Sequence, residues 1–237
     1  MNADRTARLE TKLAGLARTR HVPRTETGDS KTIASQIGGV AWLAPKSKWP
    51  KCKSCKKPMQ LLLQLRADDA PSGGIVVPTG KVAQIFHCGR SSCDEGYTST
   101  PDGDGKLVRL IDEKGATRAS DAPAHLSLAK RIVGFDAAPE LPGWQDLREN
   151  AAAKLNAKEM SAVQNSEQRP YGRTKLGGWA DWIQSASSPS CEKCDQPMRF
   201  VLQLQGGEIV DFGDSGLAYV HQCATHADQF AMGWSST

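Results

Sequence analysis

Two short cysteine motifs in near-identical surroundings constrain the fold of this chain more than any other feature. The motifs are Cys52–Cys55 and Cys191–Cys194, each with two residues between its cysteines. The surrounding segments Gln36–Leu65 and Lys175–Leu204 align without gaps at a constant offset of 139 residues, and 11 of the 30 positions are identical. The shared residues are two glycines, an alanine, both cysteines, two prolines, a methionine and a Leu-Gln-Leu triplet. A match concentrated on such residue types indicates an internal duplication.

The hydrophobic pattern predicts mainly short strands, two of them just after the cysteine motifs. Apolar runs of strand length that are bounded by turn residues favour strands. The expected strands are Met59–Leu65, Lys81–Cys88, Lys106–Asp112, Arg131–Phe135, Met198–Leu204, Leu217–Cys223 and Phe230–Ser236.

Two segments are expected to be helical. Asp4–Thr19 places Leu9, Leu13 and Leu16 at helical spacing, and Pro23 follows it. Trp144–Asn165 places Leu147, Ala151, Leu155 and Val163 toward one side. This second helix lies between the two copies, so we expect it to pack on both of them.

These expectations together predict an α+β fold with two tandem β-rich cysteine-knuckle repeats. Residues 1–30 form an N-terminal helix and linker, and residues 31–138 form the first repeat. Residues 139–172 form a helical connector, and residues 173–237 form the second repeat.

The spacing of cysteines and histidines predicts one zinc site in each repeat. Zinc prefers four soft ligands in a tetrahedron, and a Cys-x-x-Cys turn supplies two of them. The first site takes Cys52, Cys55, Cys88 and Cys93. The second takes Cys191, Cys194, Cys223 and His226, with His221 as an alternative fourth ligand. Because each site already has four protein ligands, both zinc ions are expected to be structural.

Signatures of catalysis are missing from the sequence. None of the five histidines is followed two residues later by glutamate, as a zinc deaminase requires. The chain has no His-Glu-x-x-His and no Gly-x-Ser-x-Gly motif. We therefore expect a protein that is not an enzyme.

Composition and charge indicate a protein that does not enter a membrane. No apolar run approaches the length of about 18 residues that a membrane helix needs, and residues 1–5 resemble no secretory signal. A cytoplasmic location is expected, since thiols stay reduced there. Two bound zinc ions with deprotonated cysteines lower the formal charge from +4 to +1.

The total charge therefore requires no polyanionic partner, but the first knuckle itself is basic. Its lysines surround Trp49 and could grip phosphates while the indole stacks on a base. The lysines are Lys46, Lys48, Lys51, Lys53, Lys56 and Lys57. The second knuckle has Glu192 and Asp195 instead. This asymmetry disfavours nucleic acid as the partner, although a nucleic-acid-binding zinc protein stays an alternative.

Several of these motifs together resemble the YwqG family. They are the segment Gln36–Leu43 with its Gly-Gly pair, Trp49-Pro50, the knuckle, Pro58-Met59 and Leu63-Gln64-Leu65. The same set is similar to the N-terminal part of programmed-cell-death-2 proteins. With its cysteines, the chain resembles the zinc-bearing branch of the YwqG family.

The resemblance implies a non-catalytic, protein-binding role. YwqG-like proteins serve as immunity proteins that block antibacterial toxins, and programmed-cell-death-2 relatives serve as chaperones of a ribosomal protein. An immunity protein that binds a cognate toxin, such as a nuclease, is the first expectation; a chaperone or adaptor is the alternative. Acidic loop residues are the expected partner-binding set: Asp68, Asp69, Asp94, Glu95, Asp102, Asp104, Glu208, Asp211 and Asp214.

Overall fold

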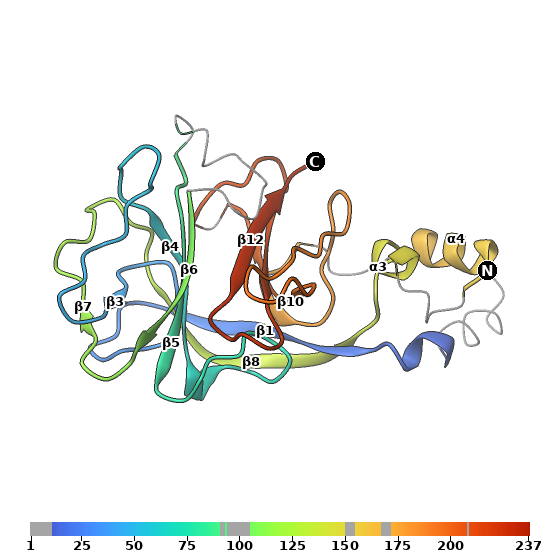
Figure 1. Ribbon diagram of the computed structural model, residues 1–237, viewed down its shortest axis with the longest axis horizontal. Helices are drawn as coiled ribbons and strands as arrows, with labels where there is room; N and C mark the ends of the chain where they lie inside the picture. The colour runs from blue at the N-terminus through green and yellow to red at the C-terminus, as the bar shows by residue number, and fades with distance from the viewer. Residues whose placement is uncertain (1–10, 91–92, 94–104, 150–154, 167–171, 208) are drawn as a thin grey trace.

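A ten-stranded antiparallel sheet carries both repeats (Figure 1). The computed structural model describes residues 11–90, 93, 105–149, 155–166, 172–207 and 209–237. The strands of the large sheet are β1 (Arg18–Thr27), β2 (Gln36–Ile37), β4 (Gln60–Arg66), β5 (Lys81–His87), β6 (Lys106–Asp112), β8 (Lys130–Glu140), β9 (Lys175–Gly177), β10 (Arg199–Gln205), β11 (Leu217–Gln222) and β12 (Phe230–Ser235). A separate small ribbon pairs β3 (Trp42–Leu43) with β7 (Thr117–Arg118).

The two copies place their equivalent strands at mirrored positions in the large sheet. The strand order runs β12-β11-β10-β9-β1-β8-β2-β4-β5-β6. The first repeat supplies β2, β4, β5 and β6, and the second supplies β9, β10, β11 and β12 in mirrored positions. The long antiparallel pair β1–β8 stands at the centre. The edge strands β6 and β12 also approach each other, so the sheet curls into an almost closed, barrel-like body.

The predicted α+β class with two separate repeats is therefore wrong. The protein is mostly β, and its short helices cover only one end of the molecule (Figure 1). A single apolar core contains side chains from both copies, such as Leu63 and Ile85 with Leu202 and Val220. The two copies fold as one body because their strands share a sheet and their inner faces share this core.

The N-terminal segment departs most from expectation. Residues 11–14 are helical, but the chain enters β1 at Arg18, so the predicted helix ends before Thr19; residues 1–10 lie outside the described part. Pro23 lies inside β1. A proline is tolerated where one side of a strand has no partner. The short β9 pairs only with Arg20 and His21, and Pro23 lies beyond that contact.

The predicted connector helix forms two helices, α3 (Trp144–Glu149) and α4 (Ala157–Ser166). Residues 150–154, including Ala151, lie outside the described residues. The helices pack against the N-terminal segment, where Leu13 and Leu147 are buried together. Toward the repeats, α3 contacts the second copy through Trp182, while packing of the connector on the first copy stays a prediction. In the described part of the chain, no helix is long and apolar enough to cross a membrane.

A loop of each copy contacts the other copy across the core. Val76, in the β4–β5 loop, is hydrogen-bonded in both directions to the side chain of Gln222 at the end of β11 (2.8 Å each). In return, Phe212 from the β10–β11 loop meets the ring of His87 at the end of β5 edge-on, with 5.3 Å between centroids. His87 and Gln222 hold equivalent positions in the two copies. Each copy therefore supports the other, which explains why neither is a separate body.

Candidate metal centres

The two knuckles have the same backbone hydrogen bonds. The N–H of Cys52 donates to Lys57 O, and that of Cys191 donates to Gln196 O, both at 2.9 Å. Lys56 and Asp195, at the same knuckle position, have positive φ angles of 61° and 56°. Non-glycine residues seldom adopt this conformation unless the surrounding structure holds them there. The tight turn aims both sulfurs of a knuckle to the same side.

The same correspondence extends to the strand that follows each knuckle. Gln64 Oε1 accepts the N–H of Trp42 (2.9 Å), and Gln203 Oε1 accepts the N–H of Asp181 (2.8 Å). Their amide nitrogens donate to the carbonyls of Ala34 and Arg173, which are also equivalent. Both glutamines are fully buried, so these bonds satisfy side-chain groups that water cannot reach. The Leu-Gln-Leu triplet that the two copies share thus anchors each Gly-Gly loop to its strand.

The first centre brings Cys52, Cys55, Cys88 and Cys93 together. The knuckle precedes β4, while Cys88 follows β5, the neighbouring strand, so strand pairing sets their distance. Sulfur–sulfur distances are 3.8 Å for Cys52–Cys93 and 3.6 Å for Cys55–Cys88. A tetrahedron with zinc–sulfur bonds of about 2.3 Å has edges of about 3.8 Å. The four thiols therefore fit a metal ion of this kind, and they are too far apart for disulfides.

The second centre brings Cys191, Cys194, Cys223 and His226 together. Cys194 and Cys223 sulfurs are 3.7 Å apart, and His226 Nδ1 is 3.7 Å from Cys191 and 3.6 Å from Cys223. With bonds of about 2.3 Å to sulfur and 2.1 Å to nitrogen, a tetrahedral ion needs a nitrogen–sulfur distance of about 3.6 Å. Both groups can therefore hold a metal ion, and each offers four ligand atoms to it.

His221, the alternative fourth ligand, lies elsewhere. Its ring is 4% exposed and stacks on Trp182 at 5.9 Å between centroids. His221 is on β11, where its side chain belongs to an aromatic cluster with Phe200 and Tyr219 rather than to the cysteines. The structure thus brings His226, and not His221, to the three cysteines.

Backbone amides prepare Cys223 to act as a thiolate. The N–H groups of Thr225 and His226 both point to its sulfur at 3.4 Å. Burial raises the pKa of Cys223, but these backbone hydrogen bonds outweigh it and lower the pKa to about 6. In the first centre, burial likewise opposes the hydrogen bond from Lys57, yet the pKa of Cys55 is lowered to about 7. A depressed thiol pKa favours the deprotonated form that metals bind.

Replacing His226 by alanine is expected to halve the bound metal, from two ions per chain to one. Three cysteines remain, but the closed four-ligand shell is lost, so the ion binds much more weakly. Metal per chain can be measured by plasma emission after gel filtration. His221→Phe is the matched control and should keep two ions. A His226→Ala protein that retains two tightly bound ions would remove this histidine from the site.

The acidic residues expected to bind a partner do not form one described surface. Asp68 and Asp69 lie in the short 3-10 helix η1 (Ala67–Asp69) and pair with Arg66, while Asp69 also accepts the hydroxyl of Ser35 at 2.7 Å. Asp211 accepts the N–H of Gly213 within its own turn. Asp214 lies in the same loop and accepts the hydroxyl of Ser215. Asp94, Glu95, Asp102, Asp104 and Glu208 lie outside the described residues.

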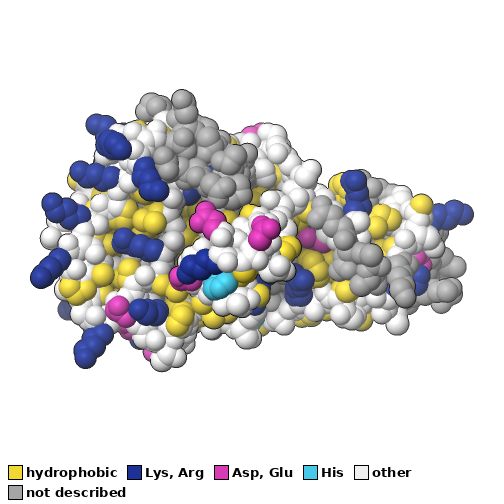
Figure 2. Space-filling model, viewed as in Figure 1, with side chains coloured by type: hydrophobic (Ala, Val, Ile, Leu, Met, Phe, Trp, Pro, Cys, Tyr) yellow, Lys and Arg dark blue, Asp and Glu magenta, His cyan; other side chains and the backbone are white. Residues whose placement is uncertain are grey.

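The basic knuckle is exposed, but its tryptophan is not. All six lysines around it are exposed, and Figure 2 shows lysines and arginines gathered over the end of the molecule that carries β3 and β7. Trp49 is only 3% exposed, and its Nε1 donates to Met59 O at 2.8 Å. This indole fills the core beside the first metal centre and meets Phe86 edge-on. It is therefore not presented for stacking on a nucleic-acid base.

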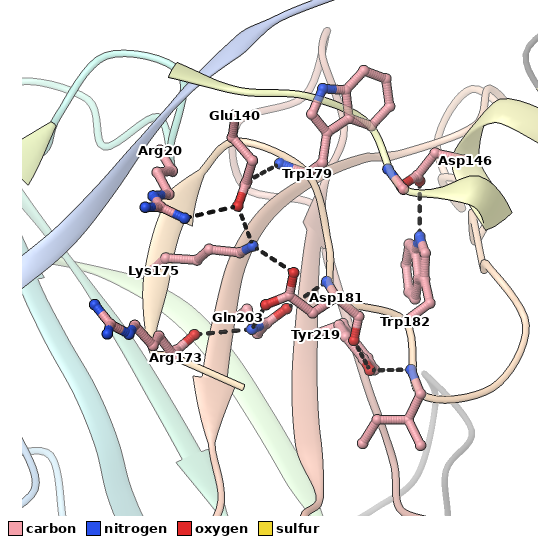
Figure 3. A network of polar contacts seen from close by, with 12 residues as sticks. Arg20, Glu140, Asp146, Arg173, Lys175, Trp179, Asp181, Trp182, Gln203 and Tyr219 are labelled. Carbon is pink, nitrogen blue, oxygen red and sulfur yellow. Dashed lines mark hydrogen bonds and ion pairs between the residues drawn. The ribbon is translucent and has the colours of Figure 1, made fainter. Parts of the chain in front are cut away.

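A buried ionic network in the second copy was not predicted (Figure 3). Lys175 Nζ donates to Glu140 at 2.9 Å and to Asp181 at 3.0 Å, and all three side chains are almost fully buried. Glu140 also accepts the N–H of Trp179 and contacts Arg20. The first copy has the neutral Gln36 in place of Lys175, bonded to the carbonyl of Gly38. A lysine flanked by the apolar Leu176 and the Gly-Gly pair was the only available signal in the sequence.

The comparisons with known proteins identify a family without an assigned activity. The model of the family described as "Domain of unknown function (DUF1963)" matches residues 35–232. The match spans both copies and both candidate metal centres. No curated protein matches the chain.

Proposed function

The chain belongs to the DUF1963 family, and we propose that it is a non-catalytic protein-binding scaffold with two structural zinc ions. In this proposal, the scaffold serves as the immunity protein of an antibacterial toxin. The observation that carries the proposal is the closed geometry of both metal centres. Each offers four ligand atoms within 4.8 Å of one another. A zinc ion that is held by four protein ligands has no open position for water or substrate.

Zinc is the proposed metal because of the ligands and their spacing. Thiolates and imidazole are soft or intermediate ligands, and a tetrahedral set of them is typical of zinc or iron–sulfur sites. Iron–sulfur clusters are held mainly by cysteine thiolates. The imidazole of His226 and the single-ion distances support zinc instead. When bound, the ion would contribute folding energy rather than reactivity.

The rest of the described structure supports a binding scaffold. The ionisable groups of the buried network around Lys175, which are Glu140, Lys175 and Asp181, are paired with one another and closed to solvent. They stabilise the fold and offer no free acid or base. A sheet made of two mirrored copies offers broad, rigid surfaces to a partner. Pre-organised surfaces of this kind change little when a partner binds.

The identity of the partner as a toxin rests on the resemblance to YwqG-like proteins, which belong to the matched family. The zinc-bearing branch of that group, and the similarity to programmed-cell-death-2 proteins, are parts of the same proposal. Such a protein would act by covering the active site or substrate groove of its toxin. Binding of this kind needs surface complementarity and no chemistry from the inhibitor.

Co-expression with the product of the neighbouring toxin gene tests this proposal. We expect growth of the host to be restored and a one-to-one complex to elute together on gel filtration. The control is the same toxin with an unrelated zinc-knuckle protein, which should not protect. Continued killing without a complex would refute the immunity role.

A further inference from the structure

The two copies differ sharply at one equivalent place on the sheet. Strand pairing sets Gln84 beside Arg109 in the first copy and Tyr219 beside Gly233 in the second. Two residues further along, Phe86 in the first copy corresponds to His221 in the second, since they pair with the equivalent residues Leu61 and Phe200. The first copy thus has an arginine where the second has a glycine.

In the first copy, a guanidinium group fills this place. Arg109 Nε donates to Gln84 Oε1 at 3.1 Å, and its central carbon lies 5.4 Å from the centre of the Phe86 ring. Burial lowers the pKa of Arg109. An extended segment covers the same side, where β7 pairs with β3 and Ala119 donates to Ala41 O at 3.0 Å.

In the second copy, the same place is a cavity of about 340 Å³. Its aromatic lining comes from Trp182, Tyr219, His221 and Trp234, and its polar lining from Gln184, Ser185, Ser187 and Ser235. Trp182 lies 4.7 Å from Tyr219 between ring centres, and Figure 3 shows these two side chains near one another. Within the described residues, no strand pairs with residues 180–182 as β7 pairs with β3.

One lining residue of the cavity, His221, also has a buried ring nitrogen without a partner in the described part of the chain. His221 is 96% buried, and its Nε2 has no hydrogen-bond partner among the described residues. A neutral imidazole ring offers a lone pair on the nitrogen that carries no hydrogen. Leaving a buried acceptor without a donor is unfavourable, and a donor from a ligand would relieve this cost.

We propose that this cavity, the 182–235 cavity, binds an arginine side chain from an extended segment of a partner protein. The partner's guanidinium would take the place that Arg109 fills in the first copy. Aromatic faces attract a guanidinium by cation–π contact and by stacking. Its planar set of N–H donors suits His221 Nε2 and the polar rim better than the compact ammonium of lysine does.

The first test measures binding of a peptide with the sequence of residues 116–120, Ala-Thr-Arg-Ala-Ser, blocked at both ends. We expect saturable shifts of the indole signals of Trp182 and Trp234 in NMR spectra, with Trp42 and Trp49 unchanged. The matched peptide with lysine in place of arginine should bind about tenfold more weakly. Equal binding of both peptides, or no binding of either, would overturn the inference.

Gly233→Arg is the decisive variant, because it supplies the residue of the first copy. Gly233 has no positive φ, so a side chain is compatible with its backbone. We expect loss of peptide binding by more than about tenfold, with two metal ions retained, while Gly233→Ala should still bind. His221→Phe, also a residue of the first copy, keeps the shape but removes Nε2 and should weaken binding. Unchanged affinity in both Gly233→Arg and His221→Phe would place the peptide elsewhere.

The inference that the toxin docks at the 182–235 cavity rests on the proposed immunity function. The docking site and the immunity function can nevertheless fail separately. If wild-type protein binds the toxin and Gly233→Arg binds it equally well, the cavity is not the docking point and the proposed function stands. If wild-type protein binds no toxin, the proposed function fails, and the peptide experiment still decides whether the cavity takes arginine.

Discussion

Removal of both metal ions is expected to unfold the protein at room temperature. Structural zinc sites contribute about 10–16 kcal/mol of apparent binding free energy in zinc-finger peptides. The net stability of a whole domain is only about 5–15 kcal/mol, so the loss of two such sites exceeds it. Chelation should abolish the β-sheet signal in far-ultraviolet circular dichroism, and added zinc should restore it.

The two centres should release their ions in order, the second before the first. Cys52, Cys88 and Cys93 are buried in a cluster with Trp49, Met59 and Phe86. The second centre has a smaller apolar cluster, and His226 is partly exposed. A chelator preloaded with zinc is the control and should leave the protein folded. An unchanged melting curve after complete metal removal would show that the ions do not hold the fold.

Replacing Lys175 by glutamine is expected to lower the free energy of unfolding by about 3–5 kcal/mol. This change leaves Asp181 buried with only neutral partners, and breaking one side of a buried ion pair has this cost. Glu140 keeps Arg20 at 3.4 Å. Urea denaturation followed by tryptophan fluorescence measures the change.

The double variant Lys175→Gln/Asp181→Asn distinguishes an ion pair from simple packing. It removes both charges together, so we expect it to recover much of the stability that the single variant loses. Gln36→Lys is the matched control in the first copy, where none of the described residues offers a buried carboxylate to that position; it should destabilise by creating an unpaired charge. A loss below about 1 kcal/mol for Lys175→Gln would mean that the ion pair contributes little.

The strands that carry the knuckles could be predicted because their apolar runs are continuous. Met59–Leu65 and Leu217–Cys223 correspond to β4 and β11 within a residue at each end. Both faces of these strands are buried, so most of their residues are apolar and the signal is strong. The spacing of the cysteines also predicted which ligand atoms meet, including His226.

The centre of the sheet could not be predicted in the same way. The sequence of β1, Arg18–Thr27, is charged and contains a proline, because most of its residues are exposed or half-buried. The strands β2 and β9 have only two and three residues, too few for a periodic signal. Without these strands, two copies of a knuckle unit look like independent domains. The pairing of Lys175 with Glu140, 35 residues away, likewise depends on topology rather than on a local pattern.

The central position of β1 affects how the protein can fold during its synthesis. The strand is made before its partner β8, which lies more than 100 residues later, and β9 follows that. At about 5–20 residues per second, a ribosome needs several seconds to supply these partners. The first knuckle and its strands can close meanwhile, since their contacts are nearer in sequence. The strand β1 must therefore stay unpaired until β8 is made, and its charges and proline help it to remain soluble meanwhile.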